Sequence, residues 1–109
     1  MERRCSERKD VKIDVKISLS GKSYAGFIDN ISPEGLGATI VTAPEEDVSG
    51  FVKGTKLELS FQAKREEITL QCEIKWINIS SEIHVGVIYI IGAEIIDPPA
   101  EYKELIRTL

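Results

Sequence analysis

The sequence predicts an all-β domain, a small antiparallel barrel or sandwich, with one helix at its C-terminus. Three observations support this fold class. Apolar and polar residues alternate with the period of two that a half-buried strand requires, in several runs along the chain. Turn residues separate these runs at intervals of roughly 8 to 12 residues. The end of the chain changes to the spacing of an amphipathic helix.

The first half of the chain contains three predicted strands. In residues 11 to 19, five aliphatic side chains alternate with lysine, aspartate and serine. The turn Ser20-Gly21-Lys22 favours a hairpin, because glycine supplies the positive φ that a tight turn needs, so residues 24 to 31 are expected to return as the second strand. A turn at residues 32 to 35 leads to a third strand at residues 36 to 41.

The middle of the chain holds the longest predicted loop, from residue 42 to residue 53. It contains a proline, a glycine and the acidic run Glu45-Glu46-Asp47, and we expect it to be a solvated surface loop. Beyond Gly54, residues 57 to 61 alternate again as a strand.

The remaining elements are two strands and the helix. Alternation over residues 68 to 76 places Cys72 on a core face, and residues 83 to 90 form the last strand, with Val87 and Tyr89 on one face. The sequence Asp97-Pro98-Pro99 is typical of a helix start. The apolar residues of the following helix are spaced at i, i+3, i+4 and i+7, namely Tyr102, Leu105, Ile106 and Leu109.

The chain of 109 residues is expected to form one domain with three parts. Residues 1 to 10 have no aliphatic side chain except Met1, so they are expected to be a flexible arm outside the core. Residues 11 to 96 form the β-structure and residues 98 to 109 the helix.

Composition excludes several function classes. Lys and Arg number 14 against 18 Asp and Glu, a net charge of -4, which argues against a general affinity for DNA, RNA or anionic membranes. No apolar run approaches the roughly 18 residues of a membrane span, and the N-terminus is charged rather than apolar, so we expect no membrane insertion and no signal peptide. Any anionic ligand must therefore meet a local basic cluster.

Catalytic and metal-binding patterns are missing from the sequence. Cys5, Cys72 and the one histidine, His84, lie far apart and give no plausible set of zinc ligands, and neither cysteine has a histidine nearby in sequence. No Gly-rich phosphate loop occurs. We expect a protein without catalysis, cofactor or metal, with reduced thiols in the cytoplasm.

Two local motifs stand out. The first is an RxxxR pattern, Arg4 and Arg8, just before the first predicted strand, with Arg3 beside it. Guanidinium groups are planar and permanently charged, which suits them to phosphate oxygens and to guanine acceptor atoms. Alone, the pattern is also compatible with a solvated tail.

The second motif is Asp29-Asn30-Ile31-Ser32-Pro33-Glu34-Gly35, at the end of the second strand. Asn30 and Ser32 are two residues apart, so in an extended stretch their side chains leave the same face and offer an amide and a hydroxyl together. Gly35 lets the backbone turn and admits a ligand closely. Alone, the motif also fits a plain strand-ending turn.

The two motifs together resemble the PilZ domain family. The matching residues are Arg4 and Arg8, then Asn30, Ser32 and Gly35, with Asn30 standing where the family more often has Asp. The likeness continues through Glu73-Ile74-Lys75-Trp76, similar to the family's strand with a hydrophobic-x-Trp pattern, and Val85-Gly86-Val87, and it spans residues 3 to about 109.

The resemblance implies a six-stranded antiparallel β-barrel with a C-terminal α-helix that binds cyclic di-GMP, the bacterial second messenger. It implies ligand contacts by Arg3, Arg4, Arg8, Asn30 and Ser32, with Gly35 keeping the ligand side clear of a Cβ. Asp29 is a further candidate for lining the site. For Trp76 two roles stay open, an apolar wall of the site or a core residue that alternates with Cys72 and Ile74.

The resulting hypothesis is a cyclic di-GMP receptor in motility or biofilm regulation, in which the ligand clamps the N-terminal arm onto the barrel and a protein partner recognises the new surface. The alternative is a PilZ-like adaptor of pilus or motility assemblies that binds no nucleotide; such members usually lack the arginine motif. A third interpretation, a barrel for single-stranded nucleic acid, is disfavoured by the acidic balance and by the low aromatic content of 6%.

Overall fold

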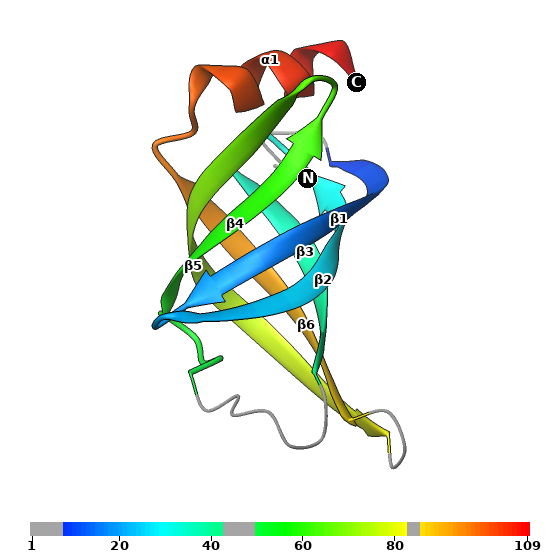
Figure 1. Cartoon of the computed structure of the whole chain (residues 1–109), viewed down its shortest axis with the longest axis vertical. Helices are drawn as coiled ribbons and strands as arrows, with labels where there is room; N and C mark the ends of the chain where they lie inside the picture. Colours follow the sequence, from blue (N-terminus) through cyan, green and yellow to red (C-terminus); the bar gives the residue numbers. More distant parts are fainter. Residues whose placement is uncertain (1–7, 43–49, 83–85) are drawn as a thin grey trace, which may run out of the picture.

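The computed structural model describes residues 8–42, 50–82 and 86–109, and these form a closed antiparallel barrel with one helix. The six strands occur in the spatial order β1-β2-β3-β6-β5-β4. Their bounds are Lys9–Leu19 for β1, Lys22–Ile31 for β2, Gly35–Thr42 for β3, Lys56–Ala63 for β4, Glu66–Glu82 for β5 and Gly86–Ile96 for β6. The helix α1 spans Ala100–Thr108. The predicted six-stranded barrel with a C-terminal helix is confirmed (Figure 1).

Closure of the barrel depends on a short contact between β1 and β4. These strands pair only at Lys16, Ser18 and the residue between them, whereas β5 and β6 pair from Gln71–Ile96 to Glu82–Gly86. Hydrogen-bonding the first strand to the fourth removes both open edges of the sheet, and open edges are otherwise sites of unwanted pairing.

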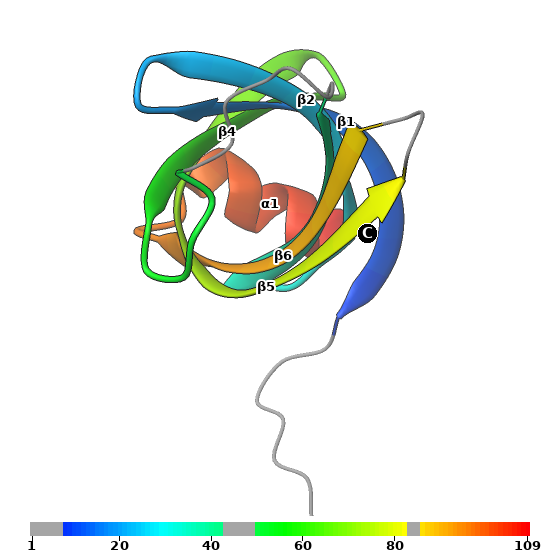
Figure 2. The same ribbon diagram turned by 90° about the horizontal axis from the view of Figure 1, so that it is seen from below.

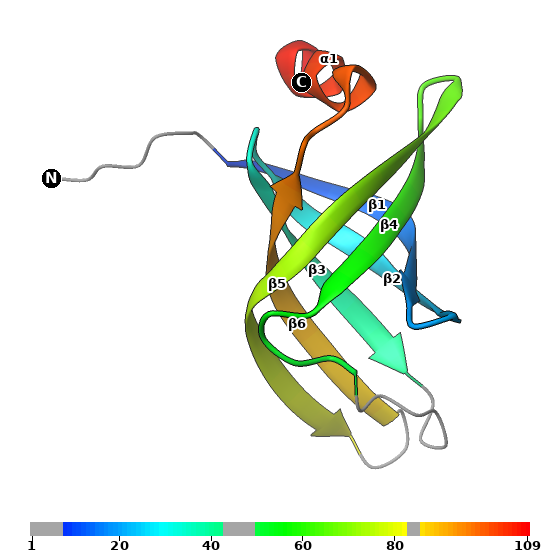
Figure 3. The ribbon, with the colours of Figure 1, turned by 90° about the vertical axis from the view of Figure 1, so that its left-hand side faces the viewer.

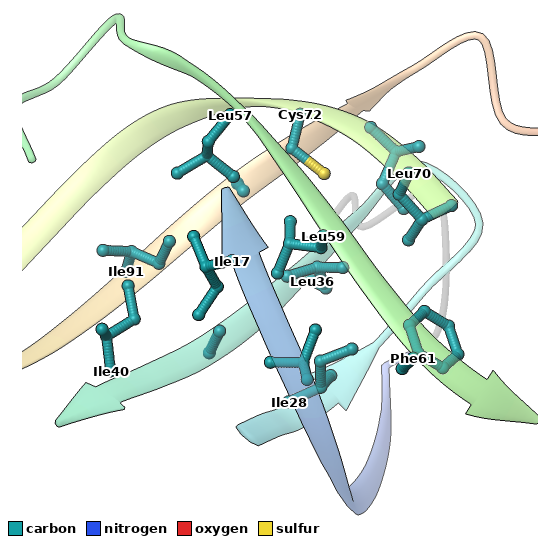
Figure 4. Packing of buried hydrophobic residues seen from close by; sticks show 14 of the residues in the cluster. Ile17, Ile28, Leu36, Ile40, Leu57, Leu59, Phe61, Leu70, Cys72 and Ile91 are labelled. Carbon is teal, nitrogen blue, oxygen red and sulfur yellow. The ribbon is translucent and has the colours of Figure 1, made fainter. Parts of the chain in front are cut away.

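The interior is filled by the alternate aliphatic side chains of all six strands. Figure 4 shows Ile17, Ile28, Ile40 and Ile91 facing one another in this core. The predicted core position of Cys72 is confirmed, because its thiol is fully buried. Burial raises the pKa of the Cys72 thiol to about 12.

The helix α1 closes one end of the barrel, as the view along the ring of strands shows (Figure 2). It buries Tyr102 and Leu105. The predicted bounds of 98 to 109 were too wide at the start, because Pro99 keeps an extended backbone, with φ -73° and ψ 162°, and serves as the N-cap. Asp97 has a φ of 49°, a left-handed conformation that turns the chain from β6 into the helix.

The expected solvated loop at residues 42 to 53 is corrected at two places. Thr42 is a buried residue of β3, and Phe51 is 3% exposed. The Phe51 ring packs against Tyr24 and Tyr89, with ring centroids 4.8 and 5.2 Å apart. The sequence does not predict the burial of Phe51, because a single aromatic residue in a loop has no hydrophobic periodicity. Residues 43–49 lie outside the described part of the chain.

The first strand starts earlier than expected, at Lys9 rather than residue 11. Lys9 pairs with Ile31 and Asp10 pairs with Asn30. Backbone pairing includes these two polar residues in β1. Hydrophobic alternation could not predict this longer strand, because neither side chain is apolar. Residues 1–7 of the expected arm, including Arg3, Arg4 and Cys5, and residues 83–85 of the expected last strand, including His84, lie outside the described residues.

The inside and outside faces of β6 give a direct test of the register. Ile91 is fully buried, whereas its neighbour Ile90 points outward and is 39% exposed. We expect Ile91→Ala to lower the free energy of unfolding by about 2 to 5 kcal/mol, because it leaves a cavity in the core. The matched change Ile90→Ala should cost less than about 1 kcal/mol. Chemical denaturation of both variants measures this, and equal losses would contradict the register.

Candidate ligand-binding site

A hollow of about 450 Å³ lies on the outside of the barrel, near the end that α1 closes. The β1 start, the β2–β3 turn, β5 and β6 contribute its walls, which consist of Arg8, Ser32, Glu34, Gly35, Lys75, Trp76, Gly92, Ala93 and Glu94. Figure 3 shows that the start of β1 and the β2–β3 turn come together below α1. Four of the site residues that the sequence predicted therefore lie together in the wall of this hollow, namely Arg8, Ser32, Gly35 and Trp76.

Three irregularities of the β-ladders surround this hollow. The register shifts between Asp10 and Ile13 in β1, between Ile28 and Asn30 in β2, and between Ile74 and Trp76 in β5. A β-bulge inserts a residue and turns the following side chains to the opposite face. In β5 this leaves Trp76 on the outside of the barrel, although Ile74, two residues earlier, is buried.

Arg8 and Asn30 connect the two sequence motifs directly. The Arg8 guanidinium donates a hydrogen bond from Nη1 to Oδ1 of Asn30, at 2.5 Å. The amide of Asn30 lies against Gly37 on β3, where a Cβ would come within 2.8 Å of Nδ2. Asn30 thus has a fixed position on the sheet and orients the guanidinium, which carries five N–H donors in all.

Ser32 shapes the turn between β2 and β3 and is 3% exposed. Its Oγ donates to the Gly35 carbonyl at 3.1 Å and accepts from the Gly35 N–H at 3.2 Å. Because β2 ends at Ile31, Ser32 lies just beyond the strand that holds Asn30. The Ser32 hydroxyl is used inside the turn, whereas Asn30 points outward to Arg8.

Gly35 lines the hollow, but the physical reason for a glycine differs from the predicted one. A Cβ at this position would come within 2.8 Å of the Ala93 carbonyl oxygen on β6. The glycine is therefore required by the close approach of β3 to β6 rather than by free space for a ligand.

Asp29 does not line the hollow. Its Oδ2 accepts a hydrogen bond from the Thr39 hydroxyl at 2.7 Å, so the carboxylate belongs to the β2–β3 face beside the site. Nothing in this geometry directs Asp29 toward a ligand in the hollow.

Trp76 lies on the outside of the barrel and is 48% exposed, so the core role is wrong and the wall role agrees with the structure. The bulge after Ile74 breaks the alternation that placed Trp76 with Cys72 and Ile74. The indole lies against Gly92, where a Cβ would come within 2.1 Å of Nε1. A glycine opposite the tryptophan is what lets the indole lie flat on the strand.

Lys75 and Glu94 are wall residues that sequence reasoning missed. The Lys75 ammonium lies 3.2 Å from Oε1 of Glu94 and 3.4 Å from Oε2 of Glu73. Hydrogen bonding to Glu94, and then to Glu73, raises the pKa of Lys75. In the sequence, the charged residues on the outward faces of β5 and β6 have the pattern of ordinary solvent-exposed positions. Their proximity depends on the register between the two strands, which the sequence does not show.

The helix α1 is joined to the site turn by one buried contact. The Tyr102 hydroxyl donates to the Ser32 carbonyl oxygen at 2.6 Å. Burial raises the pKa of Tyr102, so the hydroxyl remains a donor at neutral pH. The bond fixes the β2–β3 turn against the helix.

The described residues contain one free cysteine, Cys72. Cys72 is buried and its raised pKa keeps the thiol protonated, which removes it as a nucleophile at neutral pH. No group of three or more His, Cys, Asp or Glu side chains within residues 8–42, 50–82 and 86–109 could hold a metal ion. The helix that the described chain forms is too short to cross a membrane.

Comparisons with known proteins agree with this architecture. The sequence model described as PilZ domain matches residues 2–109. No curated protein shows a significant sequence match. Among solved structures, the PilZ domain with c-di-GMP of YcgR from Escherichia coli is similar with a TM-score of 0.75 and 11% identity over 97% of this chain and 87% of that chain.

Two further structures are similar over almost the whole chain. The inhibitor of motility MotI/DgrA of Bacillus subtilis has a TM-score of 0.70 and 19% identity over 99% of this chain and 49% of its own length. The MrkH–c-di-GMP complex of K. pneumonia has a TM-score of 0.69 and 16% identity, covering 99% of this chain and 51% of that chain. The chain thus spans about half the length of MotI and MrkH. At these identities the likeness shows the fold.

The contact between α1 and the site turn can be tested without disturbing the core. We expect Tyr102→Phe to lower the free energy of unfolding by about 1 to 2 kcal/mol, because the buried Ser32 carbonyl loses its donor. Tyr89→Phe is the control, since Tyr89 is also buried and its hydroxyl has no hydrogen bond to the described residues. Thermal and chemical denaturation compare the two, and an equal effect would show that the Tyr102 hydrogen bond adds no stability.

Proposed function

The chain belongs to the PilZ domain family, and on that premise we propose that it is a receptor for cyclic di-GMP that passes the signal to a protein partner. The observation that carries the proposal is the hydrogen bond between Arg8 and Asn30 at the wall of the hollow. It joins the two motifs of the family's nucleotide site in one geometry. The YcgR and MrkH structures, which hold c-di-GMP, support the same ligand.

The charge distribution supports a small anionic ligand. The chain has a net charge of -4, yet Arg8 is an exposed cation at the hollow and Lys75 also lines it. A guanidinium can donate two parallel hydrogen bonds to a phosphate, or donate to O6 and N7 of a guanine. In the proposal, Arg8, Arg4 and Arg3 supply these contacts, and Asn30 holds Arg8 in position.

The remaining wall residues fit the other parts of a guanine dinucleotide. Trp76 offers an exposed aromatic surface on which a base can stack, a contact worth about 1 to 3 kcal/mol for single bases on proteins. The Ser32–Gly35 turn presents a rigid backbone next to Arg8. The hollow of about 450 Å³ is open on one side, so part of the ligand remains accessible to an additional segment.

The proposed signal is the closure of the N-terminal segment over the bound ligand. Arg8 stands immediately before β1 and contacts Asn30, so a ligand held by Arg8 would lie close to the point where residues 1 to 7 join the barrel. Arginines from that segment would complete the phosphate contacts, and the surface formed in this way would be recognised by a partner. We propose that this binding role, without catalysis, is exercised in the cytoplasm.

The arginine motif is the first part to test. We expect Arg8→Ala to weaken cyclic di-GMP binding by about 10- to 100-fold, since each hydrogen bond between charged groups contributes roughly 1.5 to 3 kcal/mol. Arg4→Ala should have a similar effect. Arg65→Ala, in the β4–β5 turn, is the control for loss of one positive charge.

Isothermal titration calorimetry measures these affinities, with cyclic di-AMP and GTP as comparison ligands, and thermal melting checks that the fold is kept. Wild-type affinity in both motif variants would refute the site, and absence of binding to the wild type would refute the function.

Closure of the N-terminal segment is tested separately by amide hydrogen exchange. We expect saturating cyclic di-GMP to increase the protection of residues 2 to 10, because the ligand would hold them against the barrel. Backbone amides of β4, which contributes no residue to the hollow, serve as an internal reference. Unchanged protection of residues 2 to 10 in the presence of bound ligand would disprove the clamp while leaving the receptor function intact.

A further inference from the structure

Glu94 occupies an unusual position on the wall of the hollow. On one side it pairs with Gly35 of β3, and on the other it pairs with Glu73 of β5. Gly35 has no side chain, so the strand next to Glu94 on the side of the hollow presents only backbone. Glu73 and Glu94 are like charges directly opposite each other, an arrangement that destabilises a sheet. A nearby cation offsets this repulsion.

Lys75 is that cation. Lys75 follows the buried Ile74 on β5 and lies on the outer face, where its ammonium contacts Glu94 at 3.2 Å and Glu73 at 3.4 Å. Of the two carboxylates, only that of Glu94 lines the hollow, together with Lys75. A ligand in the hollow would therefore meet a hydrogen-bond donor, the Lys75 ammonium, next to an acceptor, the Glu94 carboxylate. Both lie in the same hollow as the exposed indole of Trp76.

We propose that the Lys75–Glu94 pair recognises the Watson–Crick edge of one guanine of the ligand. This inference rests on the proposed function and adds the residues that select the base. Guanine presents, in order, an acceptor at O6, a donor at N1–H and a donor at its 2-amino group. The Lys75 ammonium has three donors and supplies one to O6, while the two carboxylate oxygens of Glu94 accept from N1–H and the 2-amino group.

The same pair rejects adenine. Adenine has an amino group in the position of O6 and an unprotonated N1, so the ammonium would face a donor and the carboxylate would face a lone pair. A polar site that loses its partners disfavours the wrong ligand, since its own groups stay unpaired. Arg8 is suited to the phosphates, which cyclic di-GMP and cyclic di-AMP share, so its phosphate contacts do not distinguish the two ligands.

Charge balance explains why Glu94 needs Lys75. An isolated carboxylate would repel a ligand that carries two phosphate charges. Lys75, which also contacts Glu73, offsets part of this repulsion in the free protein and remains beside Glu94 when the base is bound. Glu73 supports the arrangement from the other side and is the natural control, because it contacts the same ammonium without lining the hollow.

The test compares cyclic di-GMP with cyclic di-IMP, which lacks only the 2-amino groups. We expect the wild type to bind cyclic di-GMP at least about tenfold more tightly, the effect of one well-placed base contact. Glu94→Ala should reduce this ratio to near one. Glu73→Ala likewise removes one negative charge that contacts Lys75, and it should keep the wild-type affinity ratio. The ratio, rather than either affinity, is the readout, because removing any carboxylate near the hollow alters general attraction to anions.

The outcomes separate the two proposals. A wild-type ratio near one, or an unchanged ratio in Glu94→Ala, would overturn the Lys75–Glu94 assignment while cyclic di-GMP binding stands. Equal loss of the ratio in Glu73→Ala and Glu94→Ala would also overturn it, since both would then act only through Lys75. Failure of the wild type to bind cyclic di-GMP at all would overturn the proposed function and the assignment together. Both glutamates are surface residues, and thermal melting of each variant confirms that the barrel is folded.

Discussion

Closure of the sheet into a barrel is the constraint on which the rest of the molecule depends. Six antiparallel strands pair in a ring, and their alternate side chains fill the interior with aliphatic groups. A regular ladder would leave the outer face with simple alternation and no special geometry. The three bulges interrupt the ladder, and the one in β5 leaves Trp76 on the outside of the barrel, where Arg8 and Lys75 also line the hollow. The site is a consequence of where the regular pairing stops.

The polar contacts at this end hold both the fold and the site together. Ser32 closes the β2–β3 turn with its own hydroxyl, and Tyr102 fixes the same turn to the helix. Arg8 contacts Asn30 on the neighbouring strand, and Lys75 links two opposed carboxylates. Arg8 and Lys75, the two cations that line the hollow among the described residues, are therefore held by protein contacts before a ligand binds. In general, such preorganisation reduces the entropy that binding must overcome, which favours affinity for a small charged ligand.

Glycines give the site its shape through close packing. Gly92 leaves room for the Trp76 indole, Gly37 for the Asn30 amide and Gly35 for the carbonyl of Ala93. In each case the missing side chain lets a neighbouring group come nearer than a Cβ would allow. The functional side chains can therefore lie flat along the outer surface and remain well placed without being buried.

The sequence by itself determined the fold class, the strands on which Ile17, Cys72 and Tyr89 point inward, and the two motifs that meet at Arg8 and Asn30. Alternation and turn chemistry are local properties, so they can be read from neighbouring residues. The structure alone decided the outward position of Trp76, the burial of Phe51, the part that Ser32 and Gly35 play in the turn, and the wall formed by Lys75 and Glu94. Bulges, cross-strand register and close backbone approach depend on which distant residues become neighbours, and no local pattern in the chain specifies that.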